Sequence, residues 1–224
     1  MKFTPKTTFR MKIAVMQPYF APYLGYFQLI NEVDTFIFYD DVNYIKSGWV
    51  NRNYLNINGE NKLFTIPLKG SSSFRKINEI EVDWDSREMK KLIKTFDQNI
   101  KKDSKSKKII EIIIESKPKK ISDMCIQSIE LFSKELGIKA IFERSSLIDF
   151  DRQNDKVMNL INICEKMGAK NYINPEGGQK LYNKKEFIEN GVKLNFIKGY
   201  PSVSIINVID DIEIHKKLNE YKII

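Results

Sequence analysis

The chain has 224 residues, of which 42% are hydrophobic and 12% aromatic, and it carries a formal net charge of +8 at pH 7. This composition excludes a disordered chain, and no apolar run approaches the ~18 residues of a membrane-spanning helix. Most of the charge lies in residues 90–120, where 11 lysines stand against four acidic residues. The rest of the chain is nearly neutral, so the net charge gives little support for nucleic-acid binding.

Residues 1–10 contain no apolar segment, and we expect them to be a leader or an expression-derived extension. Residues 11–224 are expected to form a single α/β domain. Without a secretory signal the protein is expected to be cytoplasmic. Cys125 and Cys164 show no metal or redox spacing, which fits reduced thiols in the core of a cytoplasmic protein.

The domain is predicted to begin with a strand, a turn, a helix and a second strand. Apolar runs at 12–16 and 35–39 flank a turn at 17–22 and an amphipathic stretch at 23–31. This order is typical of a βαβ unit in a parallel sheet, with the turn at the carboxyl edge. Strands at 52–57 and 63–68 flank Asn58-Gly59-Glu60-Asn61, which predicts a hairpin. A short strand is then expected within 76–82.

Residues 86–136 predict a helical subdomain. The expected helices run to about residue 100 and over 106–116 and 120–136, with Pro118 between the last two and Gly137 as a C-cap. Strands at 139–142, 171–173 and 192–196 and helices at 155–167 and from about 210 follow. The expected fold is therefore a Rossmann-like α/β fold, a mostly parallel sheet with an inserted β-hairpin and a helical subdomain.

The turn after the first strand predicts an anion-binding site. Pro18 and Pro22 stiffen this turn, and the helix that follows is expected to offer free backbone N–H groups and the positive end of its dipole. A phosphate or carboxylate group suits such a place. The alternative is that the aromatic rings only pack the helix onto the core. The candidate contact residues are Gln17, Tyr19, Tyr23 and Tyr26.

Two adjacent carboxylates, Asp40 and Asp41, follow the second predicted strand. At the carboxyl edge of a sheet they could bind a divalent cation, accept hydrogen bonds from a sugar or act as a base. Alternation along a strand would send the two side chains to opposite sides, so only one is expected to face a given pocket. An ordinary acidic turn is the alternative.

Two more segments offer groups that suit ligand binding. Residues 46–53 combine cations, amides and a tryptophan ring that could stack on a base, a sugar or a guanidinium, and Lys69 is expected to join them. The turn after the strand at 171–173 contains two glycines, a weak signal for phosphate binding. The candidate contact residues are Lys46, Trp49, Asn51, Arg52, Asn53, Lys69, Asn174, Glu176, Gly177 and Gly178.

The residues that are missing narrow the chemistry. The one histidine, His215, lies in a charged C-terminal stretch, which argues against Ser-His-Asp or Cys-His catalysis and against a histidine metal site. The chain contains no Walker loop and no G-x-G-x-x-G or G-x-S-x-G motif. Any general base is therefore an aspartate, glutamate, tyrosine or lysine.

Three motifs give the chain its resemblance to the WbqC-like family: MQPYFAPYLGYF at 16–27, DTFIFYDDV at 34–42 and GWVNRN at 48–53. The similarity extends over nearly all of 11–210, and departs from the family pattern at 98–108, where polar and lysine residues replace aromatic ones. That family is bacterial and occurs in O-antigen and other surface-polysaccharide gene clusters. The resemblance implies a lipopolysaccharide-type biosynthetic transferase that attaches an acyl or aminoacyl group to a nucleotide-linked amino sugar.

On this hypothesis the partners are a nucleotide-linked sugar and an acyl donor. Asp40 or Asp41 is the base that deprotonates the amine, and Tyr19 or Asn51 steadies the developing oxyanion. The oligomeric state stays open, with a homodimer among the options.

Two other hypotheses remain. A nucleotidylyltransferase-like enzyme would activate a sugar or acid with a nucleoside triphosphate and Mg²⁺, but Tyr23-Leu24-Gly25-Tyr26 stands where that group has H-x-G-H and lacks its imidazole. A non-catalytic anion-binding module would use Lys90–Lys120 against nucleic acid or an acidic membrane surface. Few arginines and little aromatic interleaving favour a solvated helix face instead, so no nucleic-acid partner is expected.

Overall fold

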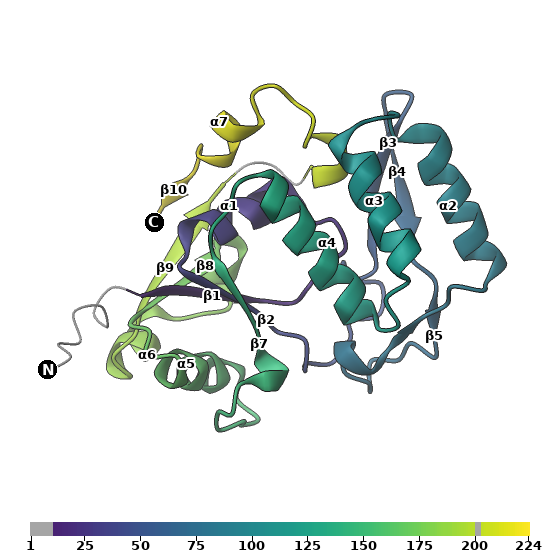
Figure 1. The fold of residues 1–224 in the computed structure, drawn as a ribbon. Coiled ribbons are helices and arrows are strands. Elements are labelled where there is room, and N and C mark those ends of the chain that lie inside the picture. Colours follow the sequence, from purple (N-terminus) through teal and green to yellow (C-terminus); the bar gives the residue numbers. More distant parts are fainter. Residues whose placement is uncertain (1–10, 200–202) are drawn as a thin grey trace, which may run out of the picture.

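The structure, a computed structural model, describes residues 11–199 and 203–224. Its centre is a six-stranded sheet in the order β10-β9-β8-β1-β2-β7 (Figure 1). Five strands are parallel, and β10 runs antiparallel to β9. The expected Rossmann-like, mostly parallel sheet is therefore confirmed. The strands are β1 (Lys12–Met16), β2 (Thr35–Phe38), β7 (Ile141–Arg144), β8 (Asn171–Pro175), β9 (Lys193–Lys198) and β10 (Lys222–Ile223).

Helices cover both faces of this sheet (Figure 1). Ile13 and Val15 of β1 pack toward the helices of one face, and Ala14 between them packs toward the other, as the alternation of a strand requires. Each face therefore has its own apolar cluster. The helices are α1 (Leu24–Glu32), α4 (Ile121–Glu135) and α7 (Ile214–Leu218) on one face, and α5 (Lys156–Lys166) and α6 (Lys184–Glu189) on the other.

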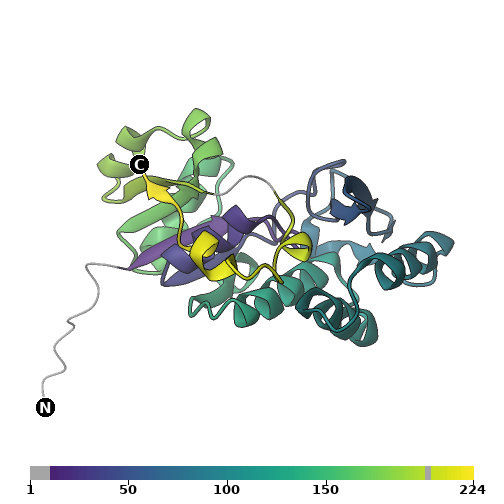
Figure 2. The ribbon, with the colours of Figure 1, turned by 90° about the horizontal axis from the view of Figure 1, so that it is seen from above.

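A long insertion separates β2 from β7 in the chain. It holds the hairpin of β3 (Arg52–Ile57) and β4 (Glu60–Thr65), a ribbon of β5 (Leu68–Lys69) and β6 (Glu81–Val82), and the helices α2 (Arg87–Asn99) and α3 (Lys105–Ser116) before α4. Figure 2 shows the hairpin, α2 and α3 together at one end of the molecule. The ring of Phe64 in β4 meets Phe96 in α2 edge to face, with centroids 5.0 Å apart. The expected hairpin and helical subdomain are confirmed.

Local chemistry accounts for where several helices begin and end. The hydroxyls of Ser86 and Ser104 accept hydrogen bonds from backbone N–H groups in the first turns of α2 and α3. Gly137 follows α4 with a φ of 70°, the left-handed conformation expected of a C-cap glycine. Within the described residues, four short 3-10 helices connect larger elements: η1 (Ile77–Glu79), η2 (Ser145–Leu147), η3 (Glu176–Lys180) and η4 (Ile205–Asn207).

Some boundaries differ from the prediction. Asn58 and Gly59 alone form the hairpin turn, with φ of 53° and 86°, so β4 begins at Glu60 and the strand expected over 63–68 was placed too late. The short strand expected within 76–82 is confirmed only at its end, as β6, and residues 77–79 form the 3-10 helix η1. The helix expected from about residue 210 begins at Ile214, and the chain continues into β10, which no periodicity could predict from two residues.

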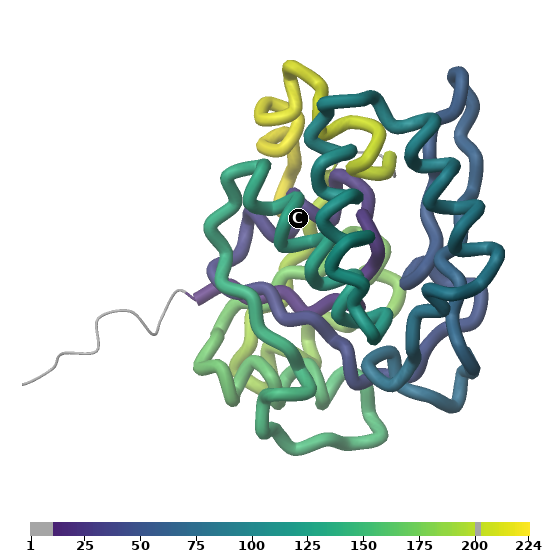
Figure 3. Tube along the Cα trace, turned by 45° about the vertical axis from the view of Figure 1, so that its right-hand side comes forward, coloured from purple at the N-terminus to yellow at the C-terminus, as the bar shows by residue number. Residues whose placement is uncertain are grey.

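The C-terminal segment lies at the top of the molecule in Figure 3, and hydrogen bonds join it to α1 and α3. Nε2 of Gln28 in α1 donates to the carbonyl oxygens of Lys217 at 2.6 Å and Glu220 at 3.1 Å. The hydroxyl of Ser106 in α3 donates to the carbonyl oxygen of Ile206 at 2.7 Å. The segment is thus fixed to two helices that are far from it in the sequence.

Two expectations remain as they were. The leader expected over residues 1–10 lies outside the described residues, and a single domain over 11–224 stays a prediction. Among the described residues, none of the helices combines the length and the apolar character needed to cross a membrane.

Candidate functional site

The carboxyl edge of the parallel sheet has a topological switch point between β1 and β8. From β1 the chain adds β2 and β7 on one side and then returns to add β8 and β9 on the other. The loops after the two central strands diverge at such a point, and open α/β sheets bind their ligands between them. Here these loops are residues 17–23 after β1 and η3 after β8.

β1 and β8 separate toward this edge. They pair at Lys12–Asn171 and Ile13–Tyr172, whereas β8 and β9 stay paired through five positions. The hydroxyl of Tyr172 donates to the carbonyl oxygen of Val15 at 3.5 Å. Val15 lies beyond the last residue of β1 that pairs with β8, so a side chain provides a hydrogen bond to the backbone there. Burial raises the pKa of Tyr172 well above its ordinary value, which keeps this hydroxyl protonated.

Asn174 and Gly178 pack tightly in the loop after β8. Nδ2 of Asn174 donates to the Tyr172 hydroxyl at 2.7 Å. A Cβ on Gly178 would lie 2.2 Å from Oδ1 of Asn174, so a larger residue would require the Asn174 side chain to move, whereas Gly177 beside it has open space. Glu176 forms an ion pair of 3.2 Å with Lys198 at the end of β9. The structure therefore brings the four candidate residues of this segment into one turn at the switch point.

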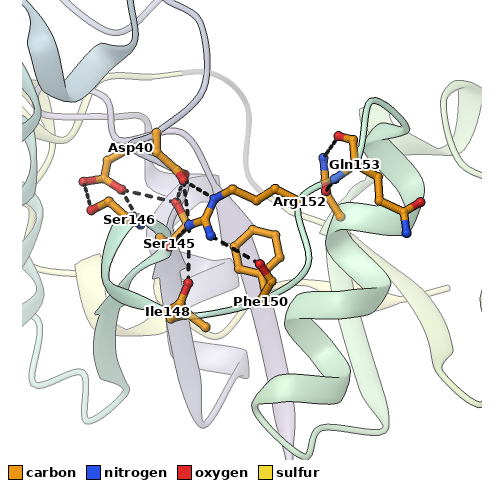
Figure 4. A network of polar contacts seen from close by, with 9 residues as sticks. Asp40, Ser145, Ser146, Ile148, Phe150, Arg152 and Gln153 are labelled. Carbon is orange, nitrogen blue, oxygen red and sulfur yellow. Dashed lines mark hydrogen bonds and ion pairs between the residues drawn. The ribbon is translucent and has the colours of Figure 1, made fainter.

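Asp40 lies just after β2, against η2 (Figure 4), and Asp41 follows it in the chain. Asp40 is 1% exposed. Its Oδ1 accepts hydrogen bonds from the Ser146 N–H at 3.0 Å and the Ser145 hydroxyl at 3.2 Å, and its Oδ2 accepts one from the Ser146 hydroxyl at 2.8 Å. The Ser145 hydroxyl is also bonded to Oδ1 of Asp41. Both carboxylates thus face one turn, and the expected opposite orientation is wrong because the strand ends at Phe38.

Arg152 joins the second carboxylate to the loop after β7. Its Nε and Nη2 lie 2.9 Å and 2.8 Å from Oδ2 of Asp41, whose side chain is only 7% exposed. Nη2 also donates to the carbonyl oxygens of Ser145 at 2.7 Å and Ile148 at 3.3 Å. The guanidinium carbon lies 4.0 Å from the centroid of the Phe150 ring. One arginine therefore holds the loops after β2 and β7 together.

Two tyrosines link this acidic network to the loop after β8. Tyr39 precedes the acidic pair, and its pKa is raised to about 12 by burial, with smaller contributions from Asp41 and Tyr182. Burial also raises the pKa of Tyr182, which follows η3. Both hydroxyls stay protonated at neutral pH and can donate hydrogen bonds to an anionic or carbonyl oxygen. The electrostatic effect of Tyr182 on the pKa of Tyr39 indicates that the loops after β2 and β8 lie near each other.

Protein groups bind some of the backbone N–H groups at the opening of α1. The Leu24 N–H donates to the carbonyl oxygen of Val203 at 3.0 Å, and the Ala21 N–H donates to the Ser128 hydroxyl at 2.9 Å. Ala21 has a φ of 45°, a conformation that costs a non-glycine residue about 1–3 kcal/mol and must be held by its surroundings. Residues 203–205 lie against this helix end, and the anion site expected there stays a prediction.

The side chains of the same turn pack against one another. Tyr26 is fully buried, and its hydroxyl donates to the carbonyl oxygen of Gln17 at 2.9 Å. The rings of Tyr19 and Tyr23 contact it, with centroids 5.7 Å and 6.3 Å away. Burial raises the pKa of Tyr19 to about 12, so this hydroxyl is a donor at neutral pH. Gln17 and Tyr19 are half-buried at the switch point, while Tyr26 belongs to the core.

The two amides predicted within 46–53 hold the hairpin in place. Nδ2 of Asn51 donates to the carbonyl oxygen of Ile66 at 2.7 Å, and its Oδ1 accepts from the Tyr44 hydroxyl at 2.7 Å. Nδ2 of Asn53 donates to the carbonyl oxygen of Phe20 at 3.3 Å. Both side chains are buried, so their polar groups serve the contact between the hairpin and the turn after β1.

The other candidates of that region lie at the surface. Lys46 and Trp49 are exposed, and Arg52 is half-buried beside the tryptophan ring. Lys69 lies 3.9 Å from the carboxylates of both Asp83 and Asp85, which offset its charge.

An open hollow of about 580 Å³ lies beside η3, at the carboxyl end of β9. It is lined by residues 179–184 and by Phe196, and Nζ of Lys184 lies 5.5 Å from the centroid of the Phe196 ring. Lys180 adds a second cation. The volume suits a small-molecule ligand, and the position next to the switch point is the usual one for a ligand of such a sheet.

The acidic pair does not fit a Mg²⁺ site in this arrangement. Magnesium prefers carboxylate and water oxygens in octahedral geometry. Here the oxygens of Asp40 and Asp41 accept hydrogen bonds from serines, and a guanidinium lies against the second carboxylate. Within the described parts of the chain, no three His, Cys, Asp or Glu side chains are grouped to hold a metal.

The lysine-rich segment is partly neutralised inside the fold. The Lys107 side chain is 11% exposed, with Nζ 2.7 Å from Asp97 and 3.9 Å from Glu111. Lys119 and Lys120 both lie 3.3 Å from Glu81. These ion pairs join α3 to α2 and β6 to the residues just before α4. Part of the positive charge of this segment therefore stabilises contacts within the fold.

Sequence reasoning missed Ser145, Ser146 and Arg152. The predicted strand ended at residue 142, whereas β7 continues to Arg144 and the serines follow it directly. The polar residues after this strand were a signal that could have pointed to the site. Their hydrogen-bond partners, however, depend on the pairing of β7 with β2, which is far away in the sequence. The base roles of Asp40 and Asp41 and the oxyanion roles of Tyr19 and Asn51 stay predictions.

Comparison with known proteins gives a family and a distant relative. The family model described as the WbqC-like protein family matches residues 17–204. The chain is 25% identical over 215 residues to the protein of Mycobacterium tuberculosis called "Uncharacterized protein Rv1507c", across 88% of this chain and 92% of the relative. No solved structure shows significant similarity to the chain.

Proposed function

The chain belongs to the WbqC-like protein family, and on that basis we propose that it is a transferase of bacterial surface-glycan biosynthesis. The proposed reaction attaches an acyl or aminoacyl group to the amine of a nucleotide-linked amino sugar. The observation that supports it most is the separation of β1 and β8 at the switch point, with polar side chains from the loops after β1, β2 and β8 around it. The motifs at 16–27, 34–42 and 48–53, typical of proteins from surface-polysaccharide gene clusters, support the sugar substrate.

In this reaction the amine nitrogen attacks the carbonyl carbon of an activated acyl group. A C–N bond forms, the bond between the acyl carbon and its donor breaks, and the amine loses a proton. We assign this proton to Asp40 through Ser146, whose side chain is exposed and whose hydroxyl donates to Oδ2 of Asp40 at 2.8 Å. The hydroxyl can accept the amine proton while it passes its own to the buried carboxylate.

The developing charge on the carbonyl oxygen needs a hydrogen-bond donor. Tyr19 supplies one in this proposal, because its raised pKa of about 12 keeps the hydroxyl protonated at neutral pH. Asp41 is bound by Arg152 and Ser145, which suits it to hold the loop after β7 rather than to take up a proton. Asn51 already uses its amide on Ile66 and Tyr44, so Tyr19 is the better oxyanion donor of the two.

The test is an incubation of the protein with UDP- and dTDP-linked amino sugars and acyl coenzyme A, followed by mass spectrometry. The expected result is a product heavier by one acyl group. Asp40→Asn and Ser146→Ala should each lower kcat by about 10²-fold or more. Asp149→Asn, a change of an exposed carboxylate outside the network, should leave kcat unchanged. Full turnover by both active-site variants, or no product from any amino sugar, would show that the proposal is wrong.

No observation favours the nucleotidylyltransferase alternative. Tyr26 is buried in the core, and the N–H of Leu24 is bound by residue 203. The place where that group binds its phosphates is therefore filled by protein groups. Calorimetric binding of ATP with Mg²⁺, together with release of pyrophosphate, would reverse this conclusion.

A further inference from the structure

An exposed aromatic surface lies on the β3–β4 hairpin. Trp49 is 47% exposed and Tyr54 37%, and their ring centroids are 5.8 Å apart with planes inclined at 48°. Leu63, which pairs with Tyr54 across the hairpin, is 50% exposed. Contiguous apolar groups on a surface usually mark a binding site. We call Trp49, Arg52, Tyr54 and Leu63 the hairpin platform.

Buried and bonded neighbours hold the hairpin platform in place. Alternation along β3 sends Asn53 inward and Arg52 and Tyr54 outward. Nδ2 of Asn207 in η4 donates to the carbonyl oxygen of Tyr54 at 3.1 Å, and its Oδ1 accepts from the N–H of Asn56 at 2.9 Å. The backbone that presents the aromatic rings is thus fixed before any ligand arrives, which lowers the entropic cost of binding.

Arg52 gives the hairpin platform a positive charge. Its Nε donates to the carbonyl oxygen of Gly48 at 2.9 Å, and its guanidinium carbon lies 5.7 Å from the centroid of the Trp49 ring. Neither of these described contacts is with a carboxylate. A guanidinium has five N–H donors, so most of its donors are available for an anionic group.

The other tryptophan of the chain, Trp84, has a structural role. Trp84 is half-buried, and its Nε1–H donates to the carbonyl oxygen of Pro118 at 2.9 Å. It therefore fixes the connection before α4. Trp49 has a large exposed ring in the described structure, and a role in binding accounts for it better than a role in packing.

The hairpin platform borders the switch point through the backbone. The Phe20 N–H donates to the carbonyl oxygen of Val50 at 3.0 Å. Trp49 precedes Val50, and Tyr19 precedes Phe20, so the platform and the turn after β1 are joined at this hydrogen bond. A ligand held at the switch point can extend toward the platform.

We propose that the hairpin platform binds a sugar ring that bears a carboxylate or phosphate. The C–H face of the sugar stacks on Trp49 and Tyr54, and its anionic group pairs with Arg52. The inclination of the two rings suits a puckered sugar better than a flat base, which stacks between parallel rings. This inference deepens the proposed function and rests on it, because it defines the sugar substrate as an acidic or phosphorylated one.

The binding test uses Trp49 as its own reporter. The chain has two tryptophans, so Trp84→Phe leaves Trp49 as the source of tryptophan fluorescence. The probes are D-glucuronic acid and glucose 1-phosphate, with glucose and AMP for comparison. Both acidic sugars should change the emission of Trp49. Glucose should bind at least tenfold more weakly than either of them, a difference of about 1.4 kcal/mol in binding free energy. Arg52→Gln should lower the affinity for the acidic sugars to that for glucose. Arg87 is an exposed arginine of α2, and Arg87→Gln should leave both affinities unchanged.

Trp49→Ala is examined by saturation-transfer NMR, which needs no fluorophore, with circular dichroism to show that it folds. The sugar signals should disappear. Equal binding of glucose and the acidic sugars, preference for AMP, unchanged binding by Arg52→Gln, or burial of Trp49 in a dimer of the chain would each overturn the proposal.

The two proposals fail in different ways. If Trp49→Ala keeps the KM of the wild-type protein for an acidic nucleotide-linked amino sugar, the hairpin platform is not part of the substrate site, while the transferase stands. If the platform binds acidic sugars but no amino sugar is acylated, the transferase is wrong, and the surface remains a sugar-binding one.

Discussion

At the scale of single residues, polar and small side chains of the candidate site are held by close contacts. Asp40 is buried and accepts three hydrogen bonds from Ser145 and Ser146. Gly178 leaves no space for a Cβ because Oδ1 of Asn174 occupies it. In both places the neighbouring groups determine which residue type fits. Substitutions there should therefore lower the free energy of unfolding.

Gly178→Ala should destabilise the fold and disturb the switch point. The new Cβ would lie 2.2 Å from Oδ1 of Asn174, and relieving that clash should cost about 1–3 kcal/mol. Gly177→Ala is the matched control, because nothing lies within 4 Å of its Cβ position. Urea unfolding followed by circular dichroism measures both. Equal stability of the two variants would contradict the close packing of Asn174 against Gly178.

Asp40→Ala should lower the free energy of unfolding by about 2–4 kcal/mol, because it removes a buried carboxylate that accepts three hydrogen bonds. Asp149→Ala removes a carboxylate that is fully exposed and 3.9 Å from Lys166, and it should leave the unfolding curve unchanged. Urea unfolding followed by circular dichroism measures the stability of both variants. A stability of Asp40→Ala within error of the wild-type protein would show that the network around η2 contributes nothing to folding.

At the scale of elements, the C-terminal segment completes the fold around α1. Residues 203–205 cover the start of this helix, and Gln28 on the same helix is bonded to two carbonyl groups near α7. β10 then adds an antiparallel strand at the edge formed by β9. The short C-terminal elements are therefore positioned by α1 and β9 rather than by their own sequence, which is too short for a stable helix alone.

Gln28→Ala should loosen this segment. The side chain is 0% exposed and donates at 2.6 Å and 3.1 Å, so its truncation removes two hydrogen bonds and the packing of a buried side chain, which should cost about 2–3 kcal/mol. Limited proteolysis should then cut the chain after residue 203 sooner than in the wild-type protein. Gln98→Ala, at an exposed position of α2, is the control. Identical cleavage of the two variants would contradict an anchoring role for Gln28.

At the scale of the whole molecule, buried tyrosines surround the carboxyl edge of the sheet. Burial is the main cause that raises the pKa of Tyr19 and Tyr39 to about 12 and that of Tyr26 and Tyr172 well above its ordinary value. These hydroxyls ionise later in the folded protein than in the unfolded chain. Their contribution to stability is therefore complete below about pH 10, the ordinary tyrosine pKa, and is lost as the pH rises toward 12.

The melting temperature should accordingly fall by about 5–10 °C between pH 9 and pH 11. Thermal unfolding across this range, with tyrosine ionisation followed by absorbance at 295 nm, measures the effect. Tyr19→Phe should flatten the decline, and Tyr54→Phe, at an exposed position, should not. A constant melting temperature, or ionisation of all tyrosines near pH 10 before unfolding, would contradict the burial of these hydroxyls.

The fold was largely predictable, and the site only in part. Strands β1, β2 and β3 and helices α1 and α5 follow from apolar periodicity and turn residues, which act over a few neighbouring positions. The site depends on contacts between distant segments: Ser145 and Ser146 meet Asp40 because β7 lies beside β2. The same holds at the opening of α1, where the Leu24 N–H is bonded to the carbonyl oxygen of Val203, a residue far away in the sequence.

The sequence by itself determined the parallel α/β sheet, the inserted hairpin, the helical subdomain and the membership of the WbqC-like family, because local periodicity and short motifs encode them. Only the tertiary structure decided which strands became neighbours, that β1 and β8 separate at the switch point, and that Arg152 and two serines bind the acidic pair. The physical reason is that burial and hydrogen-bond partners depend on which distant segments pack together, and packing is a property of the whole chain.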